Sequence, residues 1–91
     1  MEMKDKIVEL IRSGHRTEAI RLLEEWGQER MEDEALLLQW GELLYADGKM
    51  TEALNKFNAV LRLNPEHSKA RNYVTMINSI LGYYCKDLLN P

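Results

Sequence analysis

The stretch GHRTEAI at residues 14–20 returns as GKMTEAL at residues 48–54, an offset of 34 residues. In each copy a glycine lies three residues before the sequence Thr-Glu-Ala, and an aliphatic residue follows that sequence. A fixed period of about 20 to 50 residues is typical of proteins that stack copies of one supersecondary unit. The spacing therefore predicts a repeat architecture rather than one irregular core.

The size and charge of the chain limit its partners. Its 91 residues suffice for one domain, and its formal net charge is −3, with lysine and arginine scattered along the sequence. A chain of this charge has no long-range attraction for phosphate backbones or anionic lipids. No apolar run approaches the roughly 18 residues that a membrane span needs. We therefore expect neither a nucleic-acid partner nor a membrane partner.

The N-terminal sequence and the cysteine content indicate a cytoplasmic protein. The opening MEMKDK is followed by only two apolar residues before Glu9, which is too short an apolar run for a signal peptide. Cys85 is the one cysteine, so the chain can form no internal disulfide and no thiolate metal cage. We interpret Cys85 as a small, partly buried apolar residue.

Apolar residues recur at steps of three and four, the period of a helix, and proline occurs only at positions 65 and 91. The fourth helix must end before Pro65, because the residue before a proline is pushed out of the α region, and the last helix follows Pro65. We expect helices over about 4–13, 17–26, 33–46, from 51 to before 65, and from there to about 84 or beyond.

The turns between these helices have recognisable end signals. Gly14 and Gly48 should end the first and third helices in the left-handed conformation, which glycine adopts without a Cβ clash. Thr17 and Thr51 should cap the second and fourth helices with their hydroxyl groups. The sequence Asp47-Gly48 could also form a β-hairpin turn, but the helical period on both sides disfavours it.

The second repeated unit carries a characteristic pattern. It reads Leu37-x-x-Trp40-Gly41-x-x-Leu44, then Ala53-x-x-x-Phe57-x-x-Val60, then Pro65. The pattern resembles the tetratricopeptide repeat, a helix–turn–helix unit of 34 residues. Gly41 and Ala53 are small enough to let the paired helices approach, and Phe57 fills the space between them.

The resemblance is weaker outside that unit. In the first unit Gly14, Ala19 and Leu23 agree with the family, while Ile7, Trp26 and Met31 stand where it prefers a small residue, alanine and proline. After residue 67 the pattern is lost at Arg71, Thr75 and Asn78, so this segment is predicted to be a closing helix. The tail at residues 84–91 resembles the end of some small bacterial proteins of this class.

The resemblance implies an all-α fold over residues 1–91. It places a first repeat at about 2–33, a second at 34–67 and a capping helix at about 66–87. In this family the repeats form a right-handed superhelix, and the first helix of each repeat lines a concave groove that binds a peptide or protein segment. The groove positions transfer to Lys4, Val8, Ile11 and Arg12 in the first helix, Leu38, Gln39, Glu42 and Tyr45 in the third, and Lys69, Tyr73, Met76 and Ile80 in the fifth.

One class of the family binds a C-terminal carboxylate through five basic and amide side chains. Lys4 and Lys69 match that set, and Gln39 can stand in for an asparagine. Val8 and Tyr73 replace the remaining asparagine and arginine, and lysine does not offer a carboxylate the two-pronged contact that arginine does. The sequence therefore disfavours a carboxylate clamp.

The last helix has more apolar surface than one neighbouring helix can cover. Two adjacent apolar stripes span about 200° of its circumference, whereas packing on one neighbour needs little more than about 100°. They are Ala70, Val74, Ile77, Leu81 and Tyr84, and Tyr73, Met76, Ile80 and Tyr83. The surplus stripe could fold into the domain's own groove, or Tyr83, Tyr84, Leu88 and Leu89 could tuck back as a C-terminal plug. Otherwise the stripe could bind a peptide or a second copy of the chain.

Nothing in the sequence favours catalysis. His15 and His67 lie in predicted turns and lack the i, i+4 spacing of helical metal ligands, so we interpret them as surface residues. The acidic stretches at 24–25 and 32–34 fall on polar faces, where no carboxyl is desolvated for acid or base chemistry. We expect no catalytic residue, cofactor or metal. The prediction is a non-enzymatic module for a protein or peptide partner, with a structural protein that forms homodimers through the last helix as the alternative.

Overall fold

The computed structural model describes residues 2–84, and over this range it is all-helical, with no strand. Its elements are α1 (Met3–Arg12), α2 (Arg16–Trp26), the 3-10 turn η1 (Gly27–Glu29), α3 (Glu34–Ala46), α4 (Met50–Leu63) and α5 (Ser68–Tyr84). The all-α prediction and the five predicted helices are confirmed. The predicted plug, Cys85 and the last part of the capping helix lie outside the described residues or side chains.

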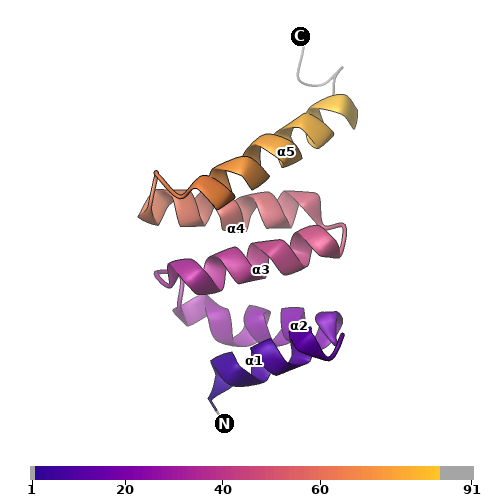
Figure 1. Cartoon of the computed structure of the whole chain (residues 1–91), viewed down its shortest axis with the longest axis vertical. Coiled ribbons are helices and arrows are strands. Elements are labelled where there is room, and N and C mark those ends of the chain that lie inside the picture. Colours follow the sequence, from indigo (N-terminus) through magenta and orange to yellow (C-terminus); the bar gives the residue numbers. More distant parts are fainter. Residues whose placement is uncertain (1, 85–91) are drawn as a thin grey trace.

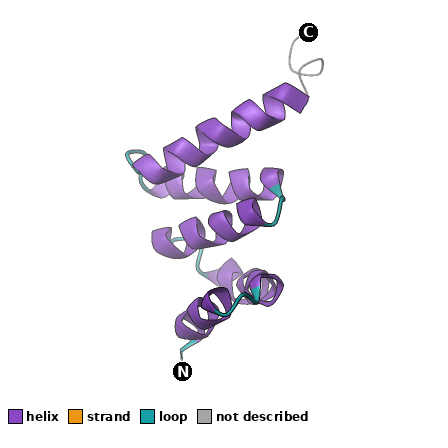
Figure 2. Cartoon of the chain, turned by 45° about the vertical axis from the view of Figure 1, so that its right-hand side comes forward, coloured by secondary structure: helices purple, strands orange, loops and turns teal. Residues whose placement is uncertain are grey.

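The helices form two layers along an elongated body measuring 51 × 26 × 20 Å. Figure 1 shows α1, α3 and α5 in the front layer, with α2 and α4 behind them. Helices that follow one another in the sequence pack against each other, and short loops connect them (Figure 2). One face of the molecule is therefore built by the three alternate helices α1, α3 and α5.

The two repeated stretches fold into the same turn. Gly14 and Gly48 have φ of +84° and +81°, the left-handed conformation that the sequence predicts. In the residue after Gly14, the N–H of His15 donates to the carbonyl of Leu10 at 2.7 Å. In the residue after Gly48, the N–H of Lys49 donates to the carbonyl of Leu44 at 2.9 Å. These six-to-one bonds are the Schellman ending of a helix. The sequence repeat is thus a repeated piece of backbone geometry.

The prediction that threonines cap α2 and α4 is wrong. The capping positions are His15 and Lys49, neither of which makes a side-chain cap bond, and Thr17 and Thr51 lie inside the helices. After the left-handed glycine the chain regains helical geometry almost at once, so the His15 carbonyl already accepts the N–H of Ala19 at 3.1 Å. The backbone of the turn, rather than a hydroxyl group, begins the helix.

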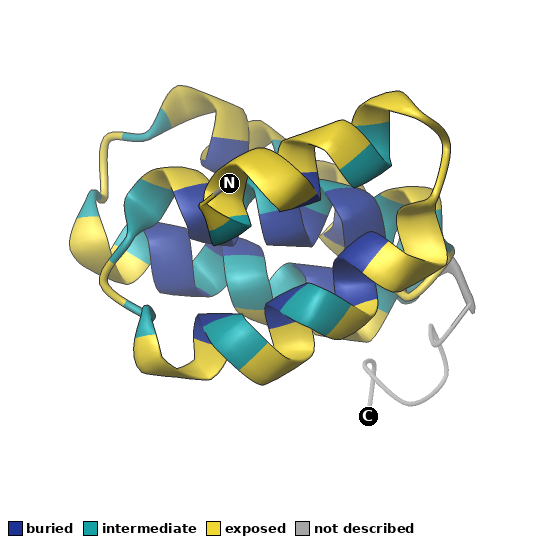
Figure 3. Ribbon diagram, turned by 90° about the horizontal axis from the view of Figure 1, so that it is seen from below, coloured by how far each residue is buried: buried dark blue, intermediate teal, exposed yellow. Residues whose placement is uncertain are grey.

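The core lies between the two layers and is entirely apolar among the described residues. Figure 3 shows the buried positions on the sides of the helices that face one another. The fully buried side chains with the largest volumes are Trp40, Phe57, Ile7, Leu23, Leu37, Leu44, Ile77 and Val60. Ala19 and Ala53, the matching alanines of the two repeated stretches, are both 0% exposed. Each therefore stands at a close contact between helices.

The paired helices α3 and α4 approach each other closely at Gly41. A Cβ added to Gly41 would lie 2.7 Å from the Phe57 ring, a distance that real Cβ atoms do not show. Gly27 has the same relation to the Trp40 ring, also at 2.7 Å. The absence of a side chain at Gly41 is what lets α3 and α4 pack around Phe57, as the sequence predicts.

We expect Gly41→Ala to destabilise the protein by about 1–2 kcal/mol. Overpacking against the ring costs about 1–3 kcal/mol, and the better helix propensity of alanine offsets up to about 1 kcal/mol of this. Gly82→Ala is the control, because a Cβ there meets nothing within 4 Å. Thermal melts should show Gly41→Ala lowering the midpoint by several degrees and Gly82→Ala leaving it unchanged or raised. Equal shifts in both variants would contradict the packing role of Gly41.

Candidate binding groove

A hollow of about 290 Å³ lies between α1 and α3. Its lining comes from one face of each helix: Lys4 and Val8 of α1, and Ala35, Leu36, Leu38, Gln39 and Glu42 of α3. Residues three and four apart lie on the same side of a helix, which explains why these positions converge while Ile7 and Leu37 point into the core. Five of the twelve predicted groove residues, Lys4, Val8, Leu38, Gln39 and Glu42, therefore meet at one site.

Two lining residues were not among the predicted groove positions. Leu36 is only 3% exposed, so it forms the floor of the hollow. Ala35 precedes Leu38 and Gln39 by three and four residues, and that spacing was the signal available in the sequence.

Two predicted residues of α1 do not line the hollow. Ile11 is half-buried and packs against the core cluster. Arg12 extends into solvent, with its Nη1 3.8 Å from the Glu9 carboxylate. Arg12 is therefore paired along its own helix.

Internal contacts occupy the space between α3 and α5. The Tyr73 ring stacks on Phe57, with centroids 4.3 Å apart and planes 4° apart, and meets the edge of Tyr45 at 5.3 Å. The Tyr73 hydroxyl donates to Oε2 of Glu42 at 3.0 Å, and Nζ of Lys69 lies 2.9 Å from the same oxygen. Partial burial, and then the bond to Glu42, raise the pKa of Tyr73 to about 12. The phenol therefore stays a donor at any physiological pH.

The surplus stripe of α5 thus divides into two parts. Tyr73 folds inward, as one of the alternatives predicts for the stripe. Met76 remains 43% exposed, and Ile80 is half-buried on the same side of the helix. In the first stripe, Ala70 and Ile77 are fully buried in the core, and Val74 and Leu81 are partly buried against it.

Asp33 links α1 to the start of α3. Its Oδ1 accepts the N–H of Leu36 at 3.1 Å, the usual bond of an N-cap, and its Oδ2 lies 2.6 Å from Nζ of Lys4. The hydrogen bond from Lys4, together with the backbone N–H of Leu36, lowers the pKa of Asp33 despite its partial burial. The predicted groove lysine at position 4 is therefore already matched by a carboxylate.

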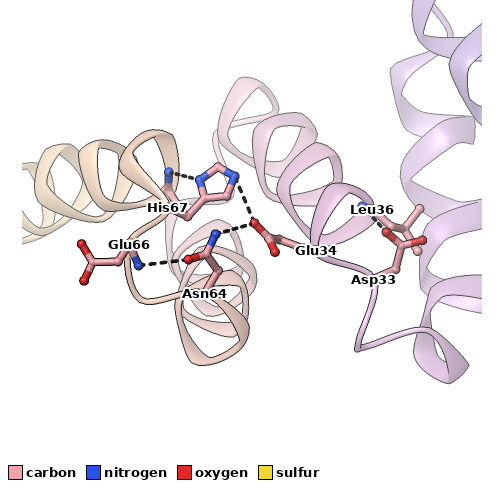
Figure 4. A network of polar contacts seen from close by, with 7 residues as sticks. Asp33, Glu34, Leu36, Asn64, Glu66 and His67 are labelled. Atoms are coloured by element: carbon pink, nitrogen blue, oxygen red, sulfur yellow. Dashed lines mark hydrogen bonds and ion pairs between the residues drawn. The ribbon is translucent and has the colours of Figure 1, made fainter.

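A second polar cluster joins α3 to the start of α5 (Figure 4). Oε1 of Glu34 accepts from Nδ2 of Asn64 at 3.0 Å and lies 3.6 Å from Nε2 of His67. Nδ1 of His67 accepts the N–H of Ala70 at 3.1 Å, so the imidazole caps α5. The interpretation of His67 as a surface residue is wrong, since its side chain is only 19% exposed. His15 is exposed, as expected, and contacts Ser13.

A larger hollow, of about 380 Å³, lies between α2, α3 and α4, away from the predicted groove. Its polar lining comes from Glu24, Gln28, Glu52, Asn55 and Lys56. Nζ of Lys56 stands 4.1 Å from the centroid of the Trp40 ring, which forms part of the lining, so a cation of the chain itself covers that ring. The Trp40 indole N–H is buried and has no partner among the described residues.

Within residues 2–84, no group of three histidine, cysteine, aspartate or glutamate side chains is placed to hold a metal ion. No helix in the same range has the length and apolar character needed to cross a membrane. Comparison with family models, with curated proteins and with solved structures gave no match to this chain.

The contacts of Asp33 predict how stability changes in acid. Because the pKa of Asp33 is lower in the folded protein than in the unfolded chain, its contribution is complete above the unfolded value and is lost as the pH falls below it. Urea unfolding between about pH 5 and pH 3 should show a shallower loss of stability for Asp33→Asn than for the wild type. Asparagine is a matched replacement, because it can still cap α3.

Lys4→Met should also make the loss of stability shallower between about pH 5 and pH 3, because it removes the largest cause of the lowered pKa of Asp33. Parallel pH profiles for the wild type and both variants would show that the Lys4–Asp33 pair has no energetic role in the folded protein.

Proposed function

We propose that this chain is a non-enzymatic interaction module of the tetratricopeptide type, which binds a segment of another protein in the hollow between α1 and α3. The observation that carries the proposal is the convergence there of five residues that the repeat pattern had assigned to a ligand surface. The repeated Schellman turns and the alternation of front and back helices support the repeat interpretation. The single cysteine suits action in the cytoplasm.

The hollow has the mixed lining expected of a recognition site. Val8 is 39% exposed, and it lies with Leu36 and Leu38 among three side chains that can hydrogen-bond. Binding sites combine apolar surface, which supplies most of the affinity, with a few polar groups that fix the orientation of the ligand. Lys4, Gln39 and Glu42 are the polar groups of this hollow. No covalent chemistry is part of the proposal.

The test is selection of a phage-displayed library of random dodecapeptides on the full chain. We expect Val8→Asp to reduce the affinity of the enriched peptides by at least about tenfold, because a carboxylate in the hollow would have to be desolvated. Leu63→Asp is the matched control, because Leu63 is 42% exposed and lies at the end of α4, outside the hollow.

Enrichment of the same peptides by the wild type and by Val8→Asp would place binding elsewhere. A library that yields no peptide for the wild type would count against the function itself.

Self-association through α5 is a second candidate function. Met76 is 43% exposed on α5, and no further helix packs on the outer side of α5 among the described residues. A second copy of the chain could cover this surface with Met76 and Ile80 at its centre.

Sedimentation distinguishes the two functions. If α5 is a dimer interface, Met76→Asp should convert a dimer into a monomer and Val8→Asp should leave the dimer intact. If the wild type sediments as a monomer at concentrations up to about 1 mM, any self-association is weaker than about −4 kcal/mol and this candidate is excluded.

A further inference from the structure

The charged residues predicted for the groove, Lys4, Arg12, Glu42 and Lys69, are matched within the chain. Nζ of Lys4 lies 2.6 Å from Asp33, Nζ of Lys69 lies 2.9 Å from Glu42, and Arg12 pairs more loosely with Glu9 at 3.8 Å. Two of these carboxylates also have structural duties, since Asp33 caps α3 and Glu42 accepts the Tyr73 hydroxyl. A charged ligand would have to displace a partner that the fold itself uses.

An acidic segment would compete with Asp33 for Lys4. A basic segment would compete with both Lys69 and Tyr73 for Glu42. Complementary charges on partners govern specificity and on-rate, and juxtaposed like charges oppose binding. The pairing inside the groove leaves neither sign of charge in excess.

Apolar surface and one amide are left unmatched. Val8 is 39% exposed and Leu38 is partly exposed, above a floor formed by Leu36. The Gln39 side chain lines the same hollow, and it takes part in no hydrogen bond among residues 2–84. A primary amide can both donate and accept, which is what a peptide backbone group requires.

We infer that the occupant of the α1–α3 hollow is an uncharged, apolar segment of a partner protein. This inference rests on the proposed function and specifies the chemistry of its ligand. An apolar side chain of the segment packs against Val8 and Leu38, and Gln39 bonds the neighbouring backbone amide. The volume of about 290 Å³ lies at the lower end of the range for ligand pockets, which suits one or two inserted side chains.

The test uses a defined peptide, Ac-GSGLSLGSGS-NH2, titrated into the isotope-labelled full chain and followed by NMR. Three control peptides have the same length. In one, both leucines are replaced by alanine; in the other two, the first and the last serine are replaced by glutamate or by lysine. We expect the leucine peptide to shift the backbone amides of Val8, Leu38 and Gln39, and the alanine peptide to bind at least about tenfold more weakly. Gln39→Leu should weaken binding of the leucine peptide several-fold, whereas Leu63→Asp should not.

Charge dependence decides between neutral and charged occupants. The glutamate and lysine peptides should bind no tighter than the leucine peptide, and the dissociation constant should change less than about twofold between roughly 50 and 500 mM salt. Tighter binding of the glutamate peptide that Lys4→Met abolishes, or of the lysine peptide that Glu42→Gln abolishes, would overturn the inference and leave the proposed function standing. No shift with any of these peptides, alongside successful library selection, would also overturn it.

Discussion

The packing of three residues, one from each of α3, α4 and α5, holds these helices together. Gly41 of α3 leaves room for the Phe57 ring of α4, and Tyr73 of α5 stacks on that ring at 4.3 Å. Because Glu42 follows Gly41 directly, the Tyr73 hydroxyl reaches its carboxylate at 3.0 Å. Because Gly41 has no side chain, α4 can pack on α3 at this point, and the Phe57 ring of α4 in turn positions α5 through Tyr73.

This stacking makes the two sides of α3 unequal. Toward α5 the gap is filled by Tyr73 and by the pair that Lys69 forms with Glu42. Toward α1 a hollow remains, although Lys4 closes its edge by pairing with Asp33. Glu42 contributes to both sides of α3, because it lines the hollow toward α1 and contacts Tyr73 and Lys69 of α5. The hollow on this face is consequently lined by α1 and α3 alone.

The predicted groove residues that the structure brings together are those whose orientation follows from helical period alone. Lys4 and Val8, and Leu38, Gln39 and Glu42, share a face by their spacing, and the structure brings both faces to one hollow. Helical period did not predict three contacts that occupy these side chains: Lys4 with Asp33, Lys69 with Glu42, and Tyr73 with Phe57. Those contacts join different helices, and no local pattern encodes them.

By itself, the sequence determined the helices and their glycine turns, because these depend on backbone conformation and on the spacing of nearby residues; the close contact at Gly41 followed from the repeat pattern. Only the tertiary structure decided which polar groups remain available. Nε2 of His67 lies 3.6 Å from the Glu34 carboxylate because the start of α3 lies beside the start of α5. An ion pair forms or fails according to distances of a few ångströms between helices, and these distances are set by how the whole core packs.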